Sequence, residues 1–228
     1  MRERFIPETT EREKKKNIFE DPEWRKFRAD YLLKSLGLEY EDLRDKQVLD
    51  VGAGPRFVER EADKRDIRVH SLDRSREAIM FPPKLEGGIV ADAEALPIKE
   101  KSIDVVISAG AAPPFSRSEK ETIAYMNEIE RTLSDEGEAR IAAKPYPFIA
   151  EKIIPERLHG PVKFLSVEER DELETLKQKA QQESFEFLQN EGYHIESQQA
   201  EFTMSDPTQK KEQDYSKEYW ILRKRKKK

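Results

Sequence analysis

The stretch VLDVGAGPRF, Val48–Phe57, runs from apolar residues through an aspartate into two glycines that are separated by one residue. A short apolar run bounded by glycine and proline predicts a buried strand that ends in a tight loop. Glycine has no Cβ, so such a loop lets its backbone pass very close to a neighbour. The loop alone leaves three neighbours open: a pyrophosphate, a different nucleoside, or only the next helix.

From Lys46 onward the chain alternates apolar runs with helical patterns. The predicted strands are QVLDVG (47–52), IRVHSLD (67–73), GGIVAD (87–92), SIDVVISAG (102–110) and EARIAAK (138–144). Helices are predicted over 57–65, over 75–80, and from a Ser118–Glu121 capping box through Leu133 to an end at Gly137. Strands that alternate with helices imply a parallel sheet covered on both faces.

The two ends of the chain differ from this pattern. Residues 1–20 are mostly charged and are predicted to be a mobile segment, and residues 225–228 form a basic tail. One domain is predicted over 21–224, and its first helix starts at the Asp21-Pro22 pair and carries Trp24, Phe27 and Tyr31.

The second half of the domain begins with a break in the alternation. Residues 144–164 contain four prolines and are predicted to be irregular. A long polar helix is predicted from the Ser166–Glu169 capping box to Gly192. Two final strands are predicted over 193–202 and 219–226, separated by a polar loop over 205–214.

Composition excludes several classes of site. The chain of 228 residues has no cysteine, so disulfides, thiolate metal sites and cysteine nucleophiles are excluded, and no metal site is predicted. A net charge of -5 argues against nucleic acid as a partner. No apolar run approaches the roughly 18 residues of a membrane span, and the N-terminus has no apolar signal core. We therefore expect a cytoplasmic protein without a membrane partner.

Three carboxylates follow successive predicted strands. Asp50 ends the first strand, Asp73 the second and Asp92 the third. Ligands of open α/β sheets bind at the carboxyl ends of the strands, so these residues mark one candidate edge. A dinucleotide would require a third small residue where Phe57 stands, because the helix must approach there, and this reading is therefore disfavoured.

Several segments resemble the class I SAM-dependent methyltransferases of the small, single-domain type. They are VLDVGAG, HSLDRS, GGIVADAEALPIKEKSIDVVIS and EIERTLSDEGEARIA, which together lie within 47–144, with weaker likeness in FLQNEGYHIES and EYWILRKRK. The resemblance implies a Rossmann-like three-layer α/β sandwich with a mostly parallel seven-stranded sheet whose last strand is antiparallel. It also implies S-adenosyl-L-methionine (SAM) as the cofactor.

The resemblance places the cofactor on residues that follow these strands. The implied cofactor-binding residues are Asp50, Gly52, Ala53, Gly54, Asp73, Arg74, Asp92, Ala93 and Ser108. Asp73 would accept hydrogen bonds from the ribose hydroxyls, Asp92 from the adenine amino group, and Asp50 would hold the methionine ammonium. Met80 and Leu96 are candidates for apolar contact with the base. Alternatively, Asp50 and Asp92 only cap the turns that follow their strands.

One position departs from the family pattern. The family usually has a third glycine where Arg56 stands, after Pro55. Arg56 either narrows the methionine end of the pocket or places a positive charge near the cofactor carboxylate.

The acceptor side offers few candidates. His159 and Tyr146 are weak candidates for a catalytic role, and His70 and His194 fall inside predicted strands. The APPF segment, 112–115, is expected to line the acceptor pocket. We predict methyl transfer to a small-molecule acceptor, and the alternatives are an RNA or protein methyltransferase and a non-catalytic SAM-binding or regulatory module.

Overall fold

The computed structural model describes residues 21–80, 87–109, 116, 118–144, 146–158, 162, 165–208 and 211–224. Its strands are β1 (Val48–Val51), β2 (Val69–Asp73), β3 (Ile89–Val90), β4 (Ile103–Ser108), β5 (Leu133–Ala142), β6 (His194–Asp206) and β7 (Lys211–Arg223). They form one sheet in the order β3-β2-β1-β4-β5-β7-β6. Only β7 runs antiparallel to its neighbours, β5 and β6, which confirms the predicted seven-stranded, mostly parallel sheet.

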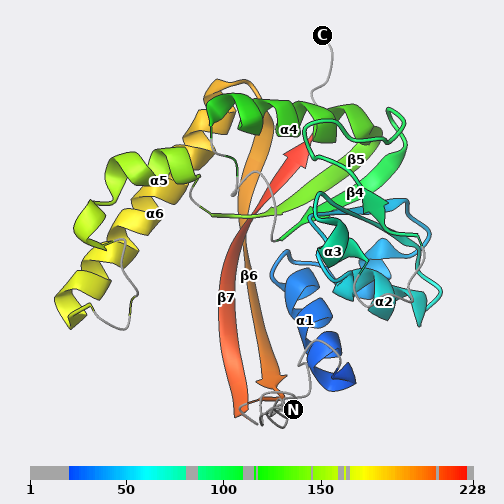
Figure 1. The fold of residues 1–228 in the computed structure, drawn as a ribbon, viewed down its shortest axis with the longest axis horizontal. Coiled ribbons are helices and arrows are strands. Elements are labelled where there is room, and N and C mark those ends of the chain that lie inside the picture. Colours follow the sequence, from blue (N-terminus) through cyan, green and yellow to red (C-terminus); the bar gives the residue numbers. More distant parts are fainter. Residues whose placement is uncertain are drawn as a thin grey trace, which may run out of the picture.

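Helices cover both faces of this sheet (Figure 1). They are α1 (Pro22–Lys34), α2 (Phe57–Asp63), α3 (Arg76–Ile79), α4 (Glu119–Thr132), α5 (Pro147–Ile153) and α6 (Val167–Asn190), with short 3₁₀ turns η3 (Tyr40–Leu43) and η4 (Glu156–Leu158). None of these helices, within the described part of the chain, is long and apolar enough to cross a membrane.

Two apolar clusters lie on opposite faces of the sheet. On one face, Val48 and Val105 pack with Leu33 of α1 and Val58 of α2. On the other face, Leu49 and Val106 pack with Met126 and Ile129 of α4 and with Leu188 of α6. Neighbouring strand residues therefore point to opposite layers, as the pleat of a strand requires. The predicted three-layer sandwich is confirmed.

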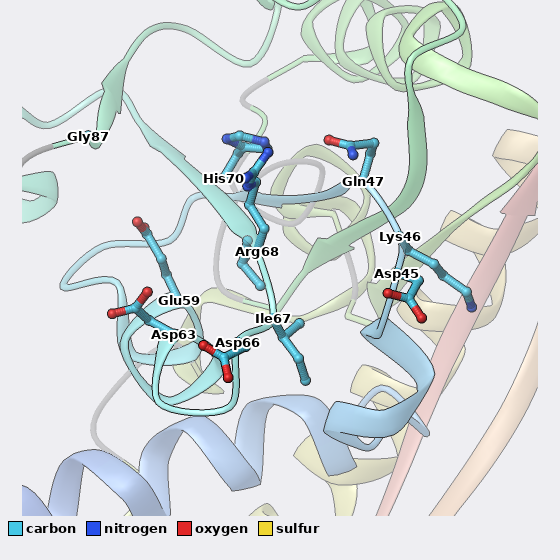
Figure 2. Close-up of a pocket in the computed structure, with 11 residues that line it drawn as sticks. Asp45, Lys46, Gln47, Glu59, Asp63, Asp66, Ile67, Arg68, His70 and Gly87 are labelled. Carbon is cyan, nitrogen blue, oxygen red and sulfur yellow. The ribbon is translucent and has the colours of Figure 1, made fainter.

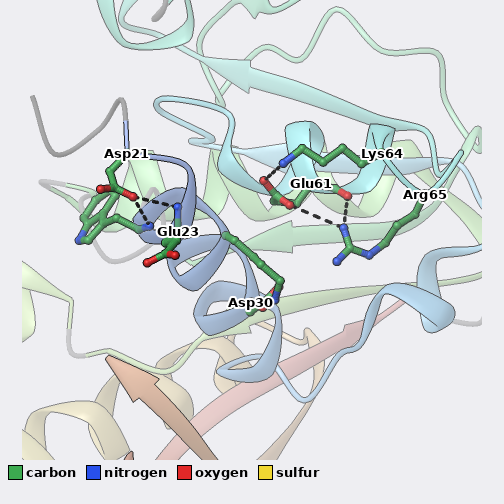
Figure 3. A network of polar contacts seen from close by, with 8 residues as sticks. Asp21, Glu23, Asp30, Glu61, Lys64 and Arg65 are labelled. Atoms are coloured by element: carbon green, nitrogen blue, oxygen red, sulfur yellow. Dashed lines mark hydrogen bonds and ion pairs between the residues drawn. The ribbon is translucent and has the colours of Figure 1, made fainter. Parts of the chain in front are cut away.

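The helix starts follow the predicted caps. Figure 3 shows the Asp21 carboxylate accepting hydrogen bonds from the backbone of Glu23 (2.9 Å) and Trp24 (3.2 Å). The Ser118 hydroxyl accepts from the Glu121 backbone in the same way. Each cap satisfies donors that the first helical turn leaves unpaired.

A complete capping box begins α6. The Ser166 hydroxyl accepts from the Glu169 backbone, and the Glu169 carboxylate accepts from the Ser166 backbone. This arrangement confirms the predicted start of the long helix.

The end of α4 was predicted too far along the chain. The helix ends at Thr132, and Leu133 already begins β5. Gly137 therefore lies inside the strand and does not end the helix. A Cβ at Gly137 would stand 2.8 Å from the backbone oxygen of Ile103, so the glycine is needed where the β5 backbone approaches β4 closely.

The predicted polar loop over 205–214 is also wrong for most of its length. β6 and β7 continue as a paired ribbon to Asp206 and Lys211. Polar side chains on the two strands of this ribbon bond to each other. For example, the Thr203 hydroxyl donates to the Asp214 carboxylate at 2.7 Å. Such cross-strand pairs stabilise strands that contain few apolar residues. Strands of this kind are not revealed by an alternation of apolar and polar residues in the sequence.

The region over 144–164 contains a helix that the sequence did not predict. α5 begins with Pro147 in its first turn, where a missing backbone N–H costs nothing. Prolines in this stretch therefore mark a helix start as well as irregular chain.

Candidate cofactor site

The strand order reverses direction at β1. β2 and β3 lie on one side of β1, and β4 and β5 lie on the other. In Figure 1 the carboxyl ends of these strands face the part of the molecule that α1 and the β6–β7 ribbon flank. Ligands of open α/β sheets bind at such a switch point, because the loops on the two sides separate there.

The loop after β1 has left-handed backbone at alternate residues. The φ angles are +73° at Gly52, +49° at Gly54 and +58° at Arg56. The loop crosses the end of β2, where the backbone N–H groups of Gly52 and Ala53 donate to the Leu72 carbonyl at 2.7 and 3.0 Å. A Cβ built on Gly54 would meet no heavy atom within 4 Å, so the loop presents open space there.

Arg56 adopts the left-handed backbone conformation that is typical of glycine, although its side chain is the largest in the loop. Its guanidinium is 1% exposed and makes a bidentate ion pair with Glu59 of α2, with 2.7 Å from Nε to Oε2. The same guanidinium lies beside Gly88, at the beginning of β3. It is therefore directed away from the carboxyl edge, and neither of the two roles expected from the sequence is needed to explain it.

Restoring the family glycine is expected to destabilise this protein. Arg56→Gly removes the strain of a left-handed backbone at a non-glycine residue, which adds roughly 1–2 kcal/mol to the unfolding free energy. Removing one partner of a buried ion pair, however, lowers the unfolding free energy by about 3–5 kcal/mol. Glu59 is 21% exposed, which reduces that cost, so we expect a net loss of about 1–2 kcal/mol in unfolding free energy. Urea unfolding measures it. The double variant Arg56→Gly/Glu59→Gln should recover part of the loss, and a single variant more stable than the parent would contradict the argument.

Asp73 ties the glycine loop to the end of β2. Its Oδ2 accepts from the Gly54 backbone at 2.9 Å, and its Oδ1 accepts from the Ser75 backbone at 2.8 Å. Ser75 in turn caps α3 by accepting from the Ala78 backbone. A carboxylate has about four acceptor positions, so Asp73 keeps capacity for two further donors.

Asp92 occupies an exposed turn after β3. Its Oδ1 accepts from the Glu94 backbone at 3.1 Å, which is the turn-capping arrangement that the sequence left as an alternative. Arg74 is exposed beside Asp73, and Ala93 is half-buried beside Asp92.

An ion pair on α4 fixes the rest of this loop. The Glu128 carboxylate accepts from the Leu96 backbone at 2.8 Å, and Arg131 donates to the carbonyls of Leu96 and Ile98. Because the pair holds Leu96 inward, its side chain lies in the core, and the expected contact of Leu96 with an adenine base is not supported.

Asp50 is a buried acid at the centre of this edge. Burial, followed by the nearby charges of Glu59 and Asp73, raises the pKa of Asp50 to about 7. Ser108 ends the neighbouring strand β4 and is buried. Asp50 and its two acidic neighbours therefore make a site that favours a cationic group.

The two weak catalytic candidates have different outcomes. The Tyr146 ring is fully buried and packs edge-on against Phe187 and Trp220, with centroids 6.3 and 5.9 Å away. Burial raises the pKa of its hydroxyl well above the ordinary value, so an acid–base role there has no support from the structure. His159 and the 112–115 segment lie outside the described residues.

Two further residues lie close enough to act on groups of this edge and were not predicted. Glu59 stands three positions after Arg56 on a helix, a spacing that indicates an ion pair. Tyr125 of α4 is buried beside Ser108, and burial raises the pKa of its hydroxyl. No local pattern reveals Tyr125, because its contact with β4 depends on tertiary packing.

A separate pocket lies at the opposite edge of the sheet. Figure 2 shows Glu59, Asp63 and Asp66 on one side of it, and across from them Arg68, which precedes β2, and His70 of β2. Residues before β1 and before β2 contribute to its wall, which places it at the amino ends of the strands. It is therefore distinct from the edge that carries the glycine loop.

Comparison with known proteins finds one matching domain family and several solved structures with a similar fold. Residues 49–141 match the model of a methyltransferase domain family. A search of curated proteins gives no match.

Solved structures share the fold at low identity. A Pyrococcus horikoshii protein is 15% identical with a TM-score of 0.52, covering 91% of this chain and 93% of its own. A putative SAM-dependent methyltransferase from Methanococcus maripaludis is 16% identical with a TM-score of 0.50, covering 94% and 97%. The plantazolicin methyltransferase BpumL, solved in complex with S-adenosylhomocysteine (SAH), is 16% identical with a TM-score of 0.51, covering 91% of this chain and 93% of its own. The match over residues 49–141 and the strand order together give this chain a methyltransferase-like fold.

Proposed function

We propose that this protein is a SAM-dependent methyltransferase that transfers the methyl group of SAM to a small-molecule acceptor. The observation that carries the cofactor side of the proposal is the convergence of Asp50, Asp73 and the glycine loop at one strand edge. The acceptor side rests on the negative net charge of -5, which disfavours a nucleic acid partner.

The residues present fit the cofactor. The open space above Gly54 accommodates the amino acid part of the cofactor beside the backbone. Asp73 has acceptor capacity left for two ribose hydroxyls. Asp50 is surrounded by other acids, so an ammonium group there neutralises a carboxylate that burial otherwise disfavours.

The remaining predicted contacts lie along the same edge. Asp92 and the backbone of Ala93 would meet the adenine edge, and Met80, which is 38% exposed, is open to contact the ring. Gly52, Ala53, Arg74 and Ser108 complete the proposed binding surface.

The chemistry asks mainly for alignment. When bound, SAM supplies a methyl group already activated by a sulfonium. Asp50, Asp73 and the glycine loop would hold the donor, whose methyl group would pass in line to the acceptor atom while the electron pair of the broken carbon–sulfur bond stays on sulfur. Holding the donor rigidly at the loop end of β1 contributes to the rate, because two aligned reactants react as in a unimolecular step.

Calorimetry and labelled-methyl transfer test the proposal together. We expect saturable binding of SAH, followed by transfer of labelled methyl from SAM to extract components that pass through a dialysis membrane. No binding of SAM or SAH would refute the cofactor assignment. Activity retained on dialysed RNA or protein would refute the small-molecule acceptor, and bound SAM without product from any fraction would support a non-catalytic module.

A further inference from the structure

The β6–β7 ribbon extends past the carboxyl edge of the sheet. β5 pairs with β7 only from Glu138 to Ala142, opposite Arg223 to Tyr219. The pairing continues one residue further, because the Ala143 backbone donates to the Glu218 carbonyl at 3.2 Å. The next residues in this register are Lys144 and Lys217, so the two lysines become cross-strand neighbours where β5 ends.

Helix α1 brings a third cation to the same place. Trp24, Arg28 and Tyr31 stand at spacings of four and three residues, so they form one stripe along the helix. The Arg28 guanidinium lies 5.8 Å from the Trp24 ring centroid and 5.5 Å from that of Tyr31. Figure 1 shows α1 running alongside the ribbon.

Aromatic contacts fix this stripe at both ends. The Tyr31 ring packs edge-on against Tyr215 of β7, with centroids 5.2 Å apart, and Tyr215 is two residues from Lys217 on the same face. At the other end, Trp24 packs against Phe57, which directly follows the glycine loop, at 5.4 Å. The stripe therefore runs from the cofactor loop to the ribbon, with Arg28 between.

Lys144 lies close enough to Lys217 and Arg28 for their charges to act on it. Within the described ranges, the structure shows no ion pair for Arg28, Lys144 or Lys217. Partial burial lowers the pKa of Lys144, and the charges of Lys217 and Arg28 lower it further. Like charges held close together destabilise a fold, so such clusters are typical of binding sites for the opposite charge.

We infer that the cation cluster of Arg28, Lys144 and Lys217 binds an anionic group, such as a carboxylate, on the methyl acceptor. The inference rests on the proposed function, because it assigns the acceptor to the same strand edge. The cluster lies one strand end beyond β4, whereas Asp50 lies in β1 and Asp73 ends β2 on the other side of the switch point. Opposite charges at the two positions would orient a cationic cofactor and an anionic acceptor toward each other.

The two tryptophans of the chain provide a direct readout. Trp24 stacks on Arg28, whereas Trp220 is fully buried in the other apolar cluster. In ¹⁵N-labelled protein saturated with SAH, benzoate should shift the Trp24 indole signal saturably and leave that of Trp220 in place. Benzyl alcohol has the same ring without the charge and should give no comparable shift. Equal responses to the two probes would overturn the inference.

Charge variants locate the anion site. Arg28→Gln, Lys144→Gln and Lys217→Gln should each weaken benzoate binding by about tenfold, the loss of one charge-assisted bond. Lys179→Gln is the matched control, because Lys179 lies on α6 beside Glu183, and it should change nothing. Benzoate binding unaffected by all three variants would overturn the assignment.

Calorimetry with SAH separates this inference from the proposed function. The three variants should bind SAH with the affinity of the parent protein. If all three bound SAH more weakly, the cluster would be assigned to the cofactor carboxylate, and the acceptor role would be refuted. Absence of SAH binding in the parent protein would instead remove the proposed function itself. In labelled-methyl assays, the acceptor in a small-molecule extract should be retained by an anion-exchange resin, and activity confined to the unretained fraction would contradict the inference.

Discussion

Replacing Asp73 with alanine is expected to weaken SAH binding by roughly 100-fold or more, because it removes charge-assisted hydrogen bonds worth about 1.5–3 kcal/mol each. The proposed ribose contacts are lost directly. The bond from Gly54 to Asp73, 2.9 Å long, is lost as well, and with it the tie that holds the glycine loop over β2. Calorimetry with SAH measures the combined effect.

Asp92→Ala is the matched control for this prediction. Asp92 is also an aspartate after a strand, but among the described residues its carboxylate bonds the Glu94 backbone, within its own turn. We expect this variant to bind SAH about tenfold more weakly, because it loses one hydrogen bond to adenine. If Asp73→Ala binds SAH no worse than Asp92→Ala, Asp73 does not have the central role assigned to it.

Asp50→Asn is expected to stabilise the ligand-free protein while it weakens cofactor binding. Burial raises the pKa of Asp50 from 3.8 to about 7, and one pKa unit corresponds to about 1.4 kcal/mol. The group therefore favours folding when protonated, and this contribution is lost as the pH rises from about 4 through 7. Asparagine carries no charge to bury. We therefore expect the unfolding free energy of the variant to exceed that of the parent by about 1–2 kcal/mol at pH 8 and to differ little at pH 4.

The same group predicts a pH dependence of binding. An ammonium binds the ionised carboxylate, so SAH affinity of the parent protein should rise as the pH passes through about 7. Asp50→Asn should bind SAH about 10–100-fold more weakly at pH 7.5, the value of a charged hydrogen bond, and should show a flatter pH profile. Thermal unfolding and calorimetry over pH 5.5–8 measure both effects. A variant that is less stable than the parent at pH 8 would contradict the argument.

The parallel half of the fold was predictable because its strands are buried on both faces. Val48–Val51 and Ile103–Ser108 are mostly apolar and are followed by a tight loop or end in serine, and such runs are read directly from sequence. The β6–β7 ribbon was not predictable beyond its apolar part. Thr203 and Asp214 stabilise it by pairing with each other, and neither residue differs from a loop residue by composition.

The site was predictable to the level of its strand ends. Asp50, Asp73 and Asp92 were found because parallel strands place their carboxyl ends at one edge. Their individual roles were not, because backbone bonds to Gly54 or Glu94 depend on loop geometry. Arg56 shows the limit most clearly: its left-handed backbone follows from the family pattern, whereas its ion pair under the loop depends on where α2 begins.

The place of β7 between β5 and β6 also sets an order of events during synthesis. Among the described strands β6 pairs with β7 alone, and the residues of β7 that join it to β5 are Tyr219–Arg223. While a ribosome makes this chain, β1 to β5 can therefore assemble, but β6 must wait until residue 223 has left the exit tunnel. During that interval β6 has no strand to pair with, which makes it the natural contact for a chaperone.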